Sequence, residues 1–222
     1  MAKKRVQKEK SEEKTNLKTN FFKENSIVFG TIIVVAVIVI AALLIIRTAN
    51  HFEYNGVEFN KRNSGDIVLY TAKIPVEDYY GNILEYRQVD FRNKPQALEG
   101  INMYNGTIKI LDADLTYISY GNLNSCEDTI LAGADLGIFL ATIGVDYKAA
   151  VDDITYKNST NTPYVNCNTN PLNTVIYIHS GNETKITKRM LSCYDIQYKD
   201  CDILPAVEKF ELTMLEQYMD RI

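Results

Sequence analysis

The uncharged run from Ile27 to Ile46 constrains this chain more than any other feature of its sequence. None of its twenty residues carries a charge, and most are Ile, Val, Ala or Leu. A helix of this length measures about 30 Å, which matches the hydrocarbon thickness of a bilayer. A helix in a protein core normally shows a polar stripe, and this run has none. We therefore predict a transmembrane helix over residues 27–46, with the lipid bilayer as its partner.

The charges that flank this run predict its orientation. Residues 1–26 hold eight basic and four acidic side chains, and their low apolar content predicts a disordered tail. On the other side, Arg47 is followed by no Lys or Arg before Lys61. By the positive-inside rule the N-terminus stays cytoplasmic and residues 47–222 lie outside the cell membrane. A cleaved signal peptide is the alternative, but its apolar region would be only roughly 7–15 residues long.

The exported part is acidic and long enough for one domain. Residues 47–222 hold 16 basic and 24 acidic side chains, a net charge of −8. Nucleic-acid binding needs a basic surface, so we exclude it as a function. Hairpin-like strand patterns, interrupted by two helical patterns, predict an exported α+β domain with its own core.

Turn residues and alternating apolar positions predict the strands of this domain. Asn55-Gly56 predicts a hairpin over residues 52–59, because a type I′ turn needs positive φ at both central positions. Antiparallel strands should follow as a meander. The further strands are expected over residues 67–74 (ended by Pro75), 83–91, 107–111, 115–120, 145–151, 174–179 and 190–197.

Two main helices are expected, over about residues 125–143 and 203–222. The first begins near Ser125, in a Ser-x-x-acid pattern that approximates a capping box, and ends at Gly144. The second begins after Asp202 and repeats apolar residues every three or four positions. We interpret that stripe as a core face, and a partner-binding face is the alternative. Strands before and after the first helix would make a βαβ unit.

All four cysteines lie in the exported part, which predicts two disulfides. Three pairings are possible. We favour Cys193–Cys201, because the short spacer between them can turn back on itself, and this leaves Cys126–Cys167. A zinc site is disfavoured by the lack of a CxxC motif, and a reactive thiol at Cys126, near a helix start, is a further alternative.

Few residues offer material for catalysis. Asp112 and Asp114 form a DxD pair, which holds a divalent metal in sugar-nucleotide transferases but more simply makes a hairpin turn. A Ser-His-Asp triad would have only His179 as its base, unless membrane-proximal His51 reaches it. No motif predicts a catalytic residue or a cofactor site, which favours a non-enzymatic role.

Three Asn-x-Ser/Thr sequons begin at Asn105, Asn158 and Asn182. Each lies in a turn-like context, as a glycan acceptor must. They are candidate glycosylation sites, although the exported part is so rich in Asn, Ser and Thr that chance alone gives roughly two sequons.

The segment Phe91-Arg92-Asn93-Lys94-Pro95 follows the predicted meander. On this segment and on the Asn-Gly hairpin after the anchor, the sequence resembles a group of uncharacterised archaeal single-pass membrane proteins. The resemblance covers most of residues 50–222, and it implies an exported α+β domain but no assigned activity. From the residues alone, the segment is a strand end shaped by Asn93 and Pro95, with Arg92 as an exposed anion contact in the alternative interpretation.

These patterns favour a membrane-anchored exported domain that acts as a surface protein or as an accessory subunit beside other envelope proteins. A membrane-tethered envelope enzyme that uses Asp112 and Asp114 is one alternative. A solute- or peptide-binding receptor domain is another, and it requires a concave apolar pocket.

Overall fold

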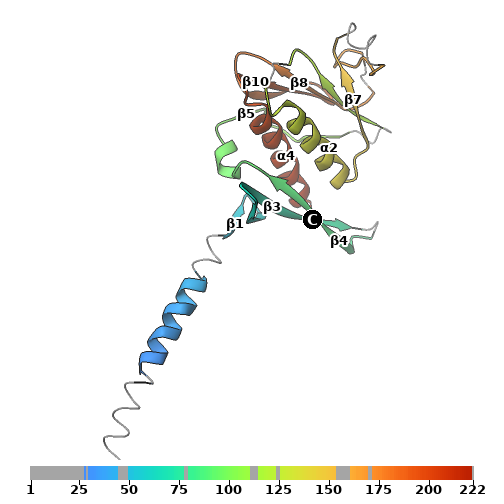
Figure 1. Ribbon diagram of the computed structural model, residues 1–222. Coiled ribbons are helices and arrows are strands. Elements are labelled where there is room, and N and C mark those ends of the chain that lie inside the picture. Colours follow the sequence, from blue (N-terminus) through green and yellow to red (C-terminus); the bar gives the residue numbers. More distant parts are fainter. Residues whose placement is uncertain are drawn as a thin grey trace, which may run out of the picture. The chain divides into compact units, whose positions relative to one another are not determined.

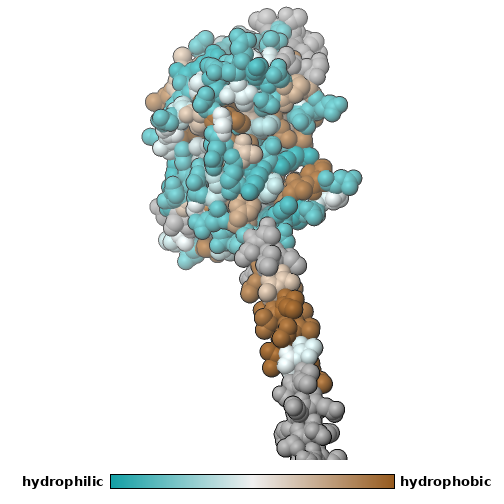
Figure 2. All heavy atoms as spheres, turned by 90° about the vertical axis from the view of Figure 1, so that its left-hand side faces the viewer, coloured by the Kyte–Doolittle hydropathy of each residue, from teal (hydrophilic) through white to brown (hydrophobic). Residues whose placement is uncertain are grey.

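The computed structural model describes residues 28, 30–44, 50–77, 80–110, 115–123, 126–153, 161–169 and 172–221. The chain divides into two compact units, Met1–Asn50 and His51–Ile222. In the first unit, residues 28 and 30–44 are helical. Their large apolar side chains are 51–62 % exposed, and they give this segment the apolar surface visible in Figure 2.

No helix among the described residues combines the length and the apolar character that crossing a membrane requires. The predicted anchor at Ile27–Ile46 lies partly outside these residues, so it stays a prediction. The predicted tail over residues 1–26 lies wholly outside them.

The second unit is α+β, as predicted, and it begins with a four-stranded antiparallel sheet in the order β1-β2-β3-β4. Asn55 and Gly56, with φ angles of 47° and 78°, connect the first two strands and confirm the predicted hairpin. The strands of this sheet are β1 (His51–Tyr54), β2 (Val57–Ser64), β3 (Ile67–Glu77) and β4 (Ile83–Phe91).

Pro75 does not end its strand, contrary to the prediction. β3 continues to Glu77, and Pro75 lies opposite Tyr86 of β4. The pairing between β2 and β3 stops at Ala72, so this part of β3 has β4 as its only neighbour. Proline is tolerated there as in an edge strand, because one side of the backbone needs no hydrogen-bond donor.

A six-stranded mixed sheet has the order β5-β9-β10-β8-β6-β7. Only β9 and β10 pair antiparallel, and the other neighbours are parallel. The strands are β5 (Asn102–Met103), β6 (Thr116–Tyr120), β7 (Tyr147–Val151), β8 (Val175–Ser180), β9 (Lys185–Met190) and β10 (Cys193–Tyr198).

The predicted βαβ unit is confirmed by β6, α2 (Thr129–Thr142) and β7, since the two strands are adjacent and parallel. Gly144 has a φ of 79° and ends the helix region as predicted. Gly137 allows a close approach to the sheet. A Cβ atom at this position would lie 2.6 Å from the Tyr147 hydroxyl, so a larger residue would displace the Tyr147 ring.

Both long helices lie between the two sheets, which makes a three-layer unit (Figure 1). The second helix, α4 (Ile203–Met219), follows β10, and a short 3₁₀ helix η1 (Pro95–Leu98) packs against it. One hydrophobic core joins residues of both sheets and both helices. Because α4 is covered on several sides, Glu208 and Glu211 are buried together with its apolar stripe.

Two predicted strands differ in the structure. Residues 107–110 form no strand, and the backbone N–H of Ile108 instead donates to Gln217 Oε1 at 2.8 Å. β6 consequently pairs with β7 and β8 rather than in a hairpin. The strand predicted over residues 190–197 corresponds to β10, which begins only at Cys193. The preceding strand β9 was not predicted, and it forms a hairpin with β10 that turns at Leu191-Ser192.

Candidate functional site

Several residues that the sequence suggested for chemistry cannot be placed. Asp112, Asp114 and Asn158 lie outside the described residues. Within the described part of the chain, no group of three or more His, Cys, Asp or Glu side chains is arranged to hold a metal ion. Asn105 and Asn182 are both exposed, so these sequons meet the steric requirement for a glycan.

The two disulfides pair differently from the prediction. The structure joins Cys126 to Cys201 and Cys167 to Cys193, each pair with Cα atoms 5.6 Å apart. Cys193 and Cys201 cannot meet because β10 separates them. Five strand steps from Cys193 to Tyr198 already span about 17 Å. The predicted partner of Cys126, Cys167, lies in the loop after β7, whereas Cys126 and Cys201 each precede a helix, and these helices pack together.

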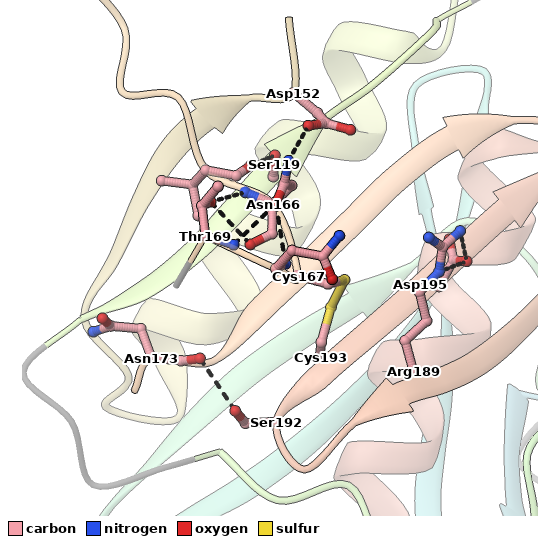
Figure 3. Close-up of a disulfide and its surroundings, with 12 residues drawn as sticks. Ser119, Asp152, Asn166, Cys167, Thr169, Asn173, Arg189, Ser192, Cys193 and Asp195 are labelled. Carbon is pink, nitrogen blue, oxygen red and sulfur yellow. Dashed lines mark hydrogen bonds and ion pairs between the residues drawn. A yellow bond between two sulfur atoms is a disulfide. The ribbon is translucent and has the colours of Figure 1, made fainter. Parts of the chain in front are cut away.

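All four cysteines are therefore oxidised in the structure, and none of them is a free thiol. This excludes both the zinc site and the reactive thiol at Cys126 in this state. The Cys167–Cys193 bond ties the loop after β7 to the outer face of the six-stranded sheet, the face opposite the helices (Figure 3). Polar contacts fix the same loop, since Asn166 Nδ2 donates to Asp152 Oδ1 at 2.7 Å and the Ser119 hydroxyl donates to the Val165 carbonyl.

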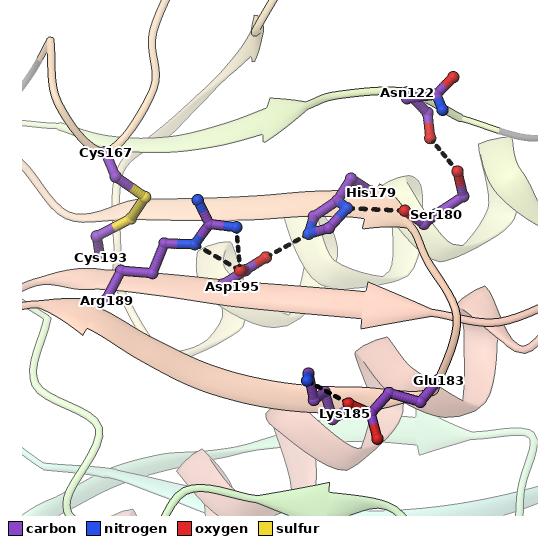
Figure 4. A network of polar contacts seen from close by, with 9 residues as sticks. All are labelled: Asn122, Cys167, His179, Ser180, Glu183, Lys185, Arg189, Cys193 and Asp195. Carbon is purple, nitrogen blue, oxygen red and sulfur yellow. Dashed lines mark hydrogen bonds and ion pairs between the residues drawn. A yellow bond between two sulfur atoms is a disulfide. The ribbon is translucent and has the colours of Figure 1, made fainter.

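A cluster of charged side chains lies beside this disulfide on the same face (Figure 4). His179 comes from β8, Asp195 from β10 and Arg189 from β9. His179 Nε2 lies 2.7 Å from Asp195 Oδ1, and Arg189 Nε donates to Asp195 Oδ2 at 2.5 Å. The Asp195 side chain is only 7 % exposed. The ring of Tyr177 stacks on His179 at 4.8 Å between centroids, so the cluster is packed as well as paired.

The hydrogen bonds of His179 decide what it can do chemically. Its Nδ1 lies 2.8 Å from the Ser180 carbonyl oxygen, and its Nε2 faces a carboxylate. Both partners are acceptors, so this geometry favours a ring that carries hydrogen on both nitrogens. The hydrogen bond to Asp195 accordingly raises the pKa of His179. A doubly protonated imidazole has no lone pair to accept a proton, so His179 is not a general base in this geometry.

Burial raises the pKa of Asp195, but its hydrogen bonds to His179 and Arg189 outweigh burial and hold that pKa below its ordinary value.

We expect an NMR titration of the full-length protein to give His179 a pKa above the ordinary 6.5. The Asp195→Asn substitution should lower the pKa of His179. The resonances of His51, the other histidine of the chain, serve as the internal control. An unchanged His179 titration in Asp195→Asn would contradict the ion pair.

A second cluster lies between the four-stranded sheet and the helices, and the sequence did not predict it. Glu208 of α4 accepts a hydrogen bond from the backbone N–H of Arg92. It also accepts from the backbone N–H of Asn93 at 3.0 Å and from Asn93 Nδ2 at 2.7 Å. Phe91 and Pro95 are buried, as a strand end predicts. The Phe-Arg-Asn-x-Pro segment thus folds around a buried carboxyl group of α4.

Arg92 does not make the exposed anion contact of the alternative interpretation. Its side chain is 35 % exposed, and its Nε lies 4.0 Å from Asp135 Oδ2 of α2. Both residues line a cavity of about 220 Å³ that also contains Asp90 and Glu211. Glu211 is 1 % exposed, and its Oε1 atom has no hydrogen-bond partner among the residues that the structure describes.

Burial controls the acidity of these carboxyl groups. It raises the pKa of Glu208 to about 7, against the opposing effect of the hydrogen bonds from Arg92 and Asn93. It raises the pKa of Glu211 well above its ordinary value, and the nearby Glu208 and Asp135 add to the effect. The pKa of Asp135 is raised by burial too, although Arg92 opposes the change. Burial and the neighbouring carboxyl groups therefore favour the neutral form of the Glu211 side chain.

A larger cavity of about 520 Å³ lies near the C-terminal ends of α2 and α4, lined by Ile108, Ile143, Met214 and Gln217 among others. The side chain of Gln217 is already used there, because it accepts from Ile108 N–H and donates to the Gly106 carbonyl. This cavity offers no unpaired buried polar atom, so the smaller cavity with Glu211 is the stronger candidate for ligand binding.

No protein-family model, curated protein or solved structure matches this chain. The resemblance to archaeal single-pass membrane proteins therefore stays a prediction.

Proposed function

We propose that this protein is a membrane-anchored domain on the outer side of the cell membrane, where it binds other envelope proteins rather than catalysing a reaction. The observation that carries the proposal is the pair of disulfides, which together use every cysteine of the chain. Disulfides persist in oxidising compartments and are rare in reducing ones. They support a location outside the cytoplasm for the His51–Ile222 unit.

The sequence before this unit supports the anchor. The helical residues 28 and 30–44 expose apolar side chains throughout, which suits a lipid environment better than water. The basic tail at residues 1–26 supports a cytoplasmic N-terminus.

The described side chains support a binding role over an enzymatic one. Both ring nitrogens of His179 are already engaged by protein groups, the Ser180 carbonyl and the Asp195 carboxylate. In the described core region, no other histidine is held by an acidic side chain. The alternative of a metal-dependent envelope enzyme depends on Asp112 and Asp114. The receptor alternative has one specific observation in its favour, the cavity that contains Glu211.

Protease treatment of intact cells tests the topology. With epitope tags at both ends of the full-length protein, external protease is expected to remove the C-terminal tag and spare the N-terminal one. Permeabilised cells, in which both tags must be lost, are the control. Protection of the C-terminal tag in intact cells would contradict export of residues 47–222.

Purification of the full-length protein in mild detergent after chemical cross-linking tests the partner. We expect a membrane or envelope protein at a defined stoichiometry. The control is the isolated first unit, Met1–Asn50, which should not recover that partner. A product that stays monomeric and alone would contradict the accessory-subunit role and favour the receptor alternative.

A further inference from the structure

The Glu211 side chain is the feature of this core that most needs an explanation, because one of its buried carboxyl oxygens has no hydrogen bond within the described part of the chain. A carboxyl oxygen that is buried without a hydrogen bond costs free energy, and native proteins rarely leave one unpaired. Glu211 Oε1 is such an atom, and Glu211 lines the cavity of about 220 Å³. Glu211 is therefore a cavity-lining residue with one unpaired and buried carboxyl oxygen.

Most of the charged groups around this cavity already form an ion pair or hydrogen bonds with other groups of the protein. Asp90 binds Arg62 at 2.8 Å and accepts from the Thr71 hydroxyl. Glu208 accepts its hydrogen bonds from the Arg92-Asn93 segment. These partners leave two carboxyl groups of the cavity uncommitted, Glu211 and Asp135.

Asp135 and Arg92 lie nearer to solvent, with 24 % and 35 % of their side chains exposed. Their separation of 4.0 Å is longer than a direct charge-assisted hydrogen bond of about 2.8 Å. We place the mouth of the cavity at this loose pair, with Glu211 at its inner end. The Asp135 carboxylate is thus available to a cation that enters.

The apolar walls and the volume of the cavity limit which class of ligand it can hold. Leu69, Val89, Ile138 and Phe139 supply apolar surface. The volume of about 220 Å³ is many times the roughly 10–15 Å³ that one water needs on this measure. No described group of three acidic or histidine side chains is arranged for a metal ion, so an organic cation fits better than a metal.

We infer that this cavity binds a small primary ammonium compound, whose –NH₃⁺ group donates to Glu211 and Asp135 and whose short alkyl chain lies on Ile138 and Phe139. The ammonium group has three N–H donors, and it satisfies the acceptor that the protein itself leaves unpaired. This goes beyond the proposed anchoring function and does not depend on it, because the cavity lies wholly within the His51–Ile222 unit.

Binding should be coupled to proton release. Burial, Glu208 on the same helix and Asp135 on α2 all favour the neutral form of Glu211. Arg92 and Asp90 are the other charged groups of the cavity. An ammonium ion favours the carboxylate, so Glu211 gives up its proton as the ion binds. Affinity is therefore expected to rise with pH.

Saturation-transfer NMR on the full-length protein in detergent tests this site with n-butylammonium as the probe. A ligand of five heavy atoms is expected to bind with a Kd on the order of 1 mM. Butan-1-ol, which lacks the charge, and tetramethylammonium, which lacks N–H donors, should bind at least tenfold more weakly, about the loss expected for one charged hydrogen bond.

Two variants identify the residues. Glu211→Gln keeps the size of the side chain and is expected to weaken n-butylammonium binding at least about tenfold and to abolish its pH dependence. Asp135→Asn, at the mouth, should weaken binding severalfold. Glu216→Gln, on the same helix but paired with Asn55, is the matched control and should bind like the wild type.

Equal binding of butan-1-ol and n-butylammonium would overturn the inference, because it would make the cavity a simple apolar pocket. Wild-type affinity in Glu211→Gln would overturn it as well, and so would the absence of any saturation transfer to n-butylammonium. None of these outcomes would bear on the topology, which the protease experiment tests separately.

Discussion

Replacing Cys126 and Cys201 by alanine is expected to lower the free energy of unfolding by about 4.5 kcal/mol, the largest effect of any change considered for this protein. The bond joins positions 75 residues apart, and the loss of stabilisation grows with the length of the closed loop. For Cys167 and Cys193, which are 26 residues apart, the same relation gives about 3.5 kcal/mol. Urea unfolding of the full-length protein, followed by circular dichroism, measures both losses.

Thiol counting provides the control for the pairing itself. With Cys126 and Cys201 replaced, the remaining Cys167–Cys193 bond should stay closed, and alkylation without reduction should find no free thiol. Replacing Cys126 and Cys167 instead removes one partner from each bond, and two thiols should then react. Two reactive thiols in the first variant, with none in the second, would contradict the pairing in the structure.

The second large effect is a fall in stability as the pH rises. Below about pH 4.5 both Glu208 and Glu211 are protonated in the folded and unfolded states, so they contribute no pH dependence. Above this pH the unfolded state loses these protons while the folded state keeps them, because burial raises both pKa values. For Glu208, whose pKa rises to about 7, the free energy of unfolding should fall by about 3 kcal/mol between pH 4.5 and 7.

Glu211 adds to this fall, because burial raises its pKa well above the ordinary value. The raised pKa of His179 acts in the same direction, since its ion pair is lost as the pH rises through its folded-state pKa. At the acid end, the lowered pKa of Asp195 has the opposite effect, because stability is lost as the pH falls through that value. Stability should therefore be greatest near about pH 4 to 5.

Urea unfolding at a series of pH values tests this profile. Glu211→Gln removes the ionisable group and keeps its shape, so the fall in stability with rising pH should be smaller in this variant than in the wild type. Glu53→Gln, an exposed position on β1, is the control and should follow the wild-type profile. The opposite result is a free energy of unfolding that rises from pH 5 to 8 in the wild type. It would mean that these carboxyl groups ionise in the folded state without loss of stability, and it would contradict the expected profile.

The elements that depend on short-range features of the sequence were predicted correctly. The β1–β2 hairpin depends on two adjacent residues that accept positive φ, and the βαβ unit depends on one helix between two strands. Where the prediction was wrong, long-range contacts decided the structure. Pro75 is accommodated because the pairing of β3 with β2 reaches only to Ala72, opposite Phe59. Residues 107–110 form no strand because Gln217 and Tyr194 side chains bind their backbone N–H groups.

The candidate site was beyond sequence reasoning for a similar reason. Glu208 and Glu211 follow core residues of α4, where a helix with one exposed face would place them in solvent. Their burial depends on a second sheet that covers that face. The available signal was the Phe-Arg-Asn-x-Pro segment, since its Arg92 and Asn93 backbone donors need an acceptor that the segment itself lacks.

By itself, the sequence determined the α+β class, the hairpin at Asn55-Gly56, the two main helices and the presence of two disulfides, because each depends on short-range periodicity, turn chemistry or cysteine count. Only the tertiary structure decided which cysteines pair, that His179 has both nitrogens occupied, and that Glu211 is buried beside a cavity. These features depend on how two sheets cover α4 from opposite sides, and that arrangement arises from contacts between residues far apart in the chain.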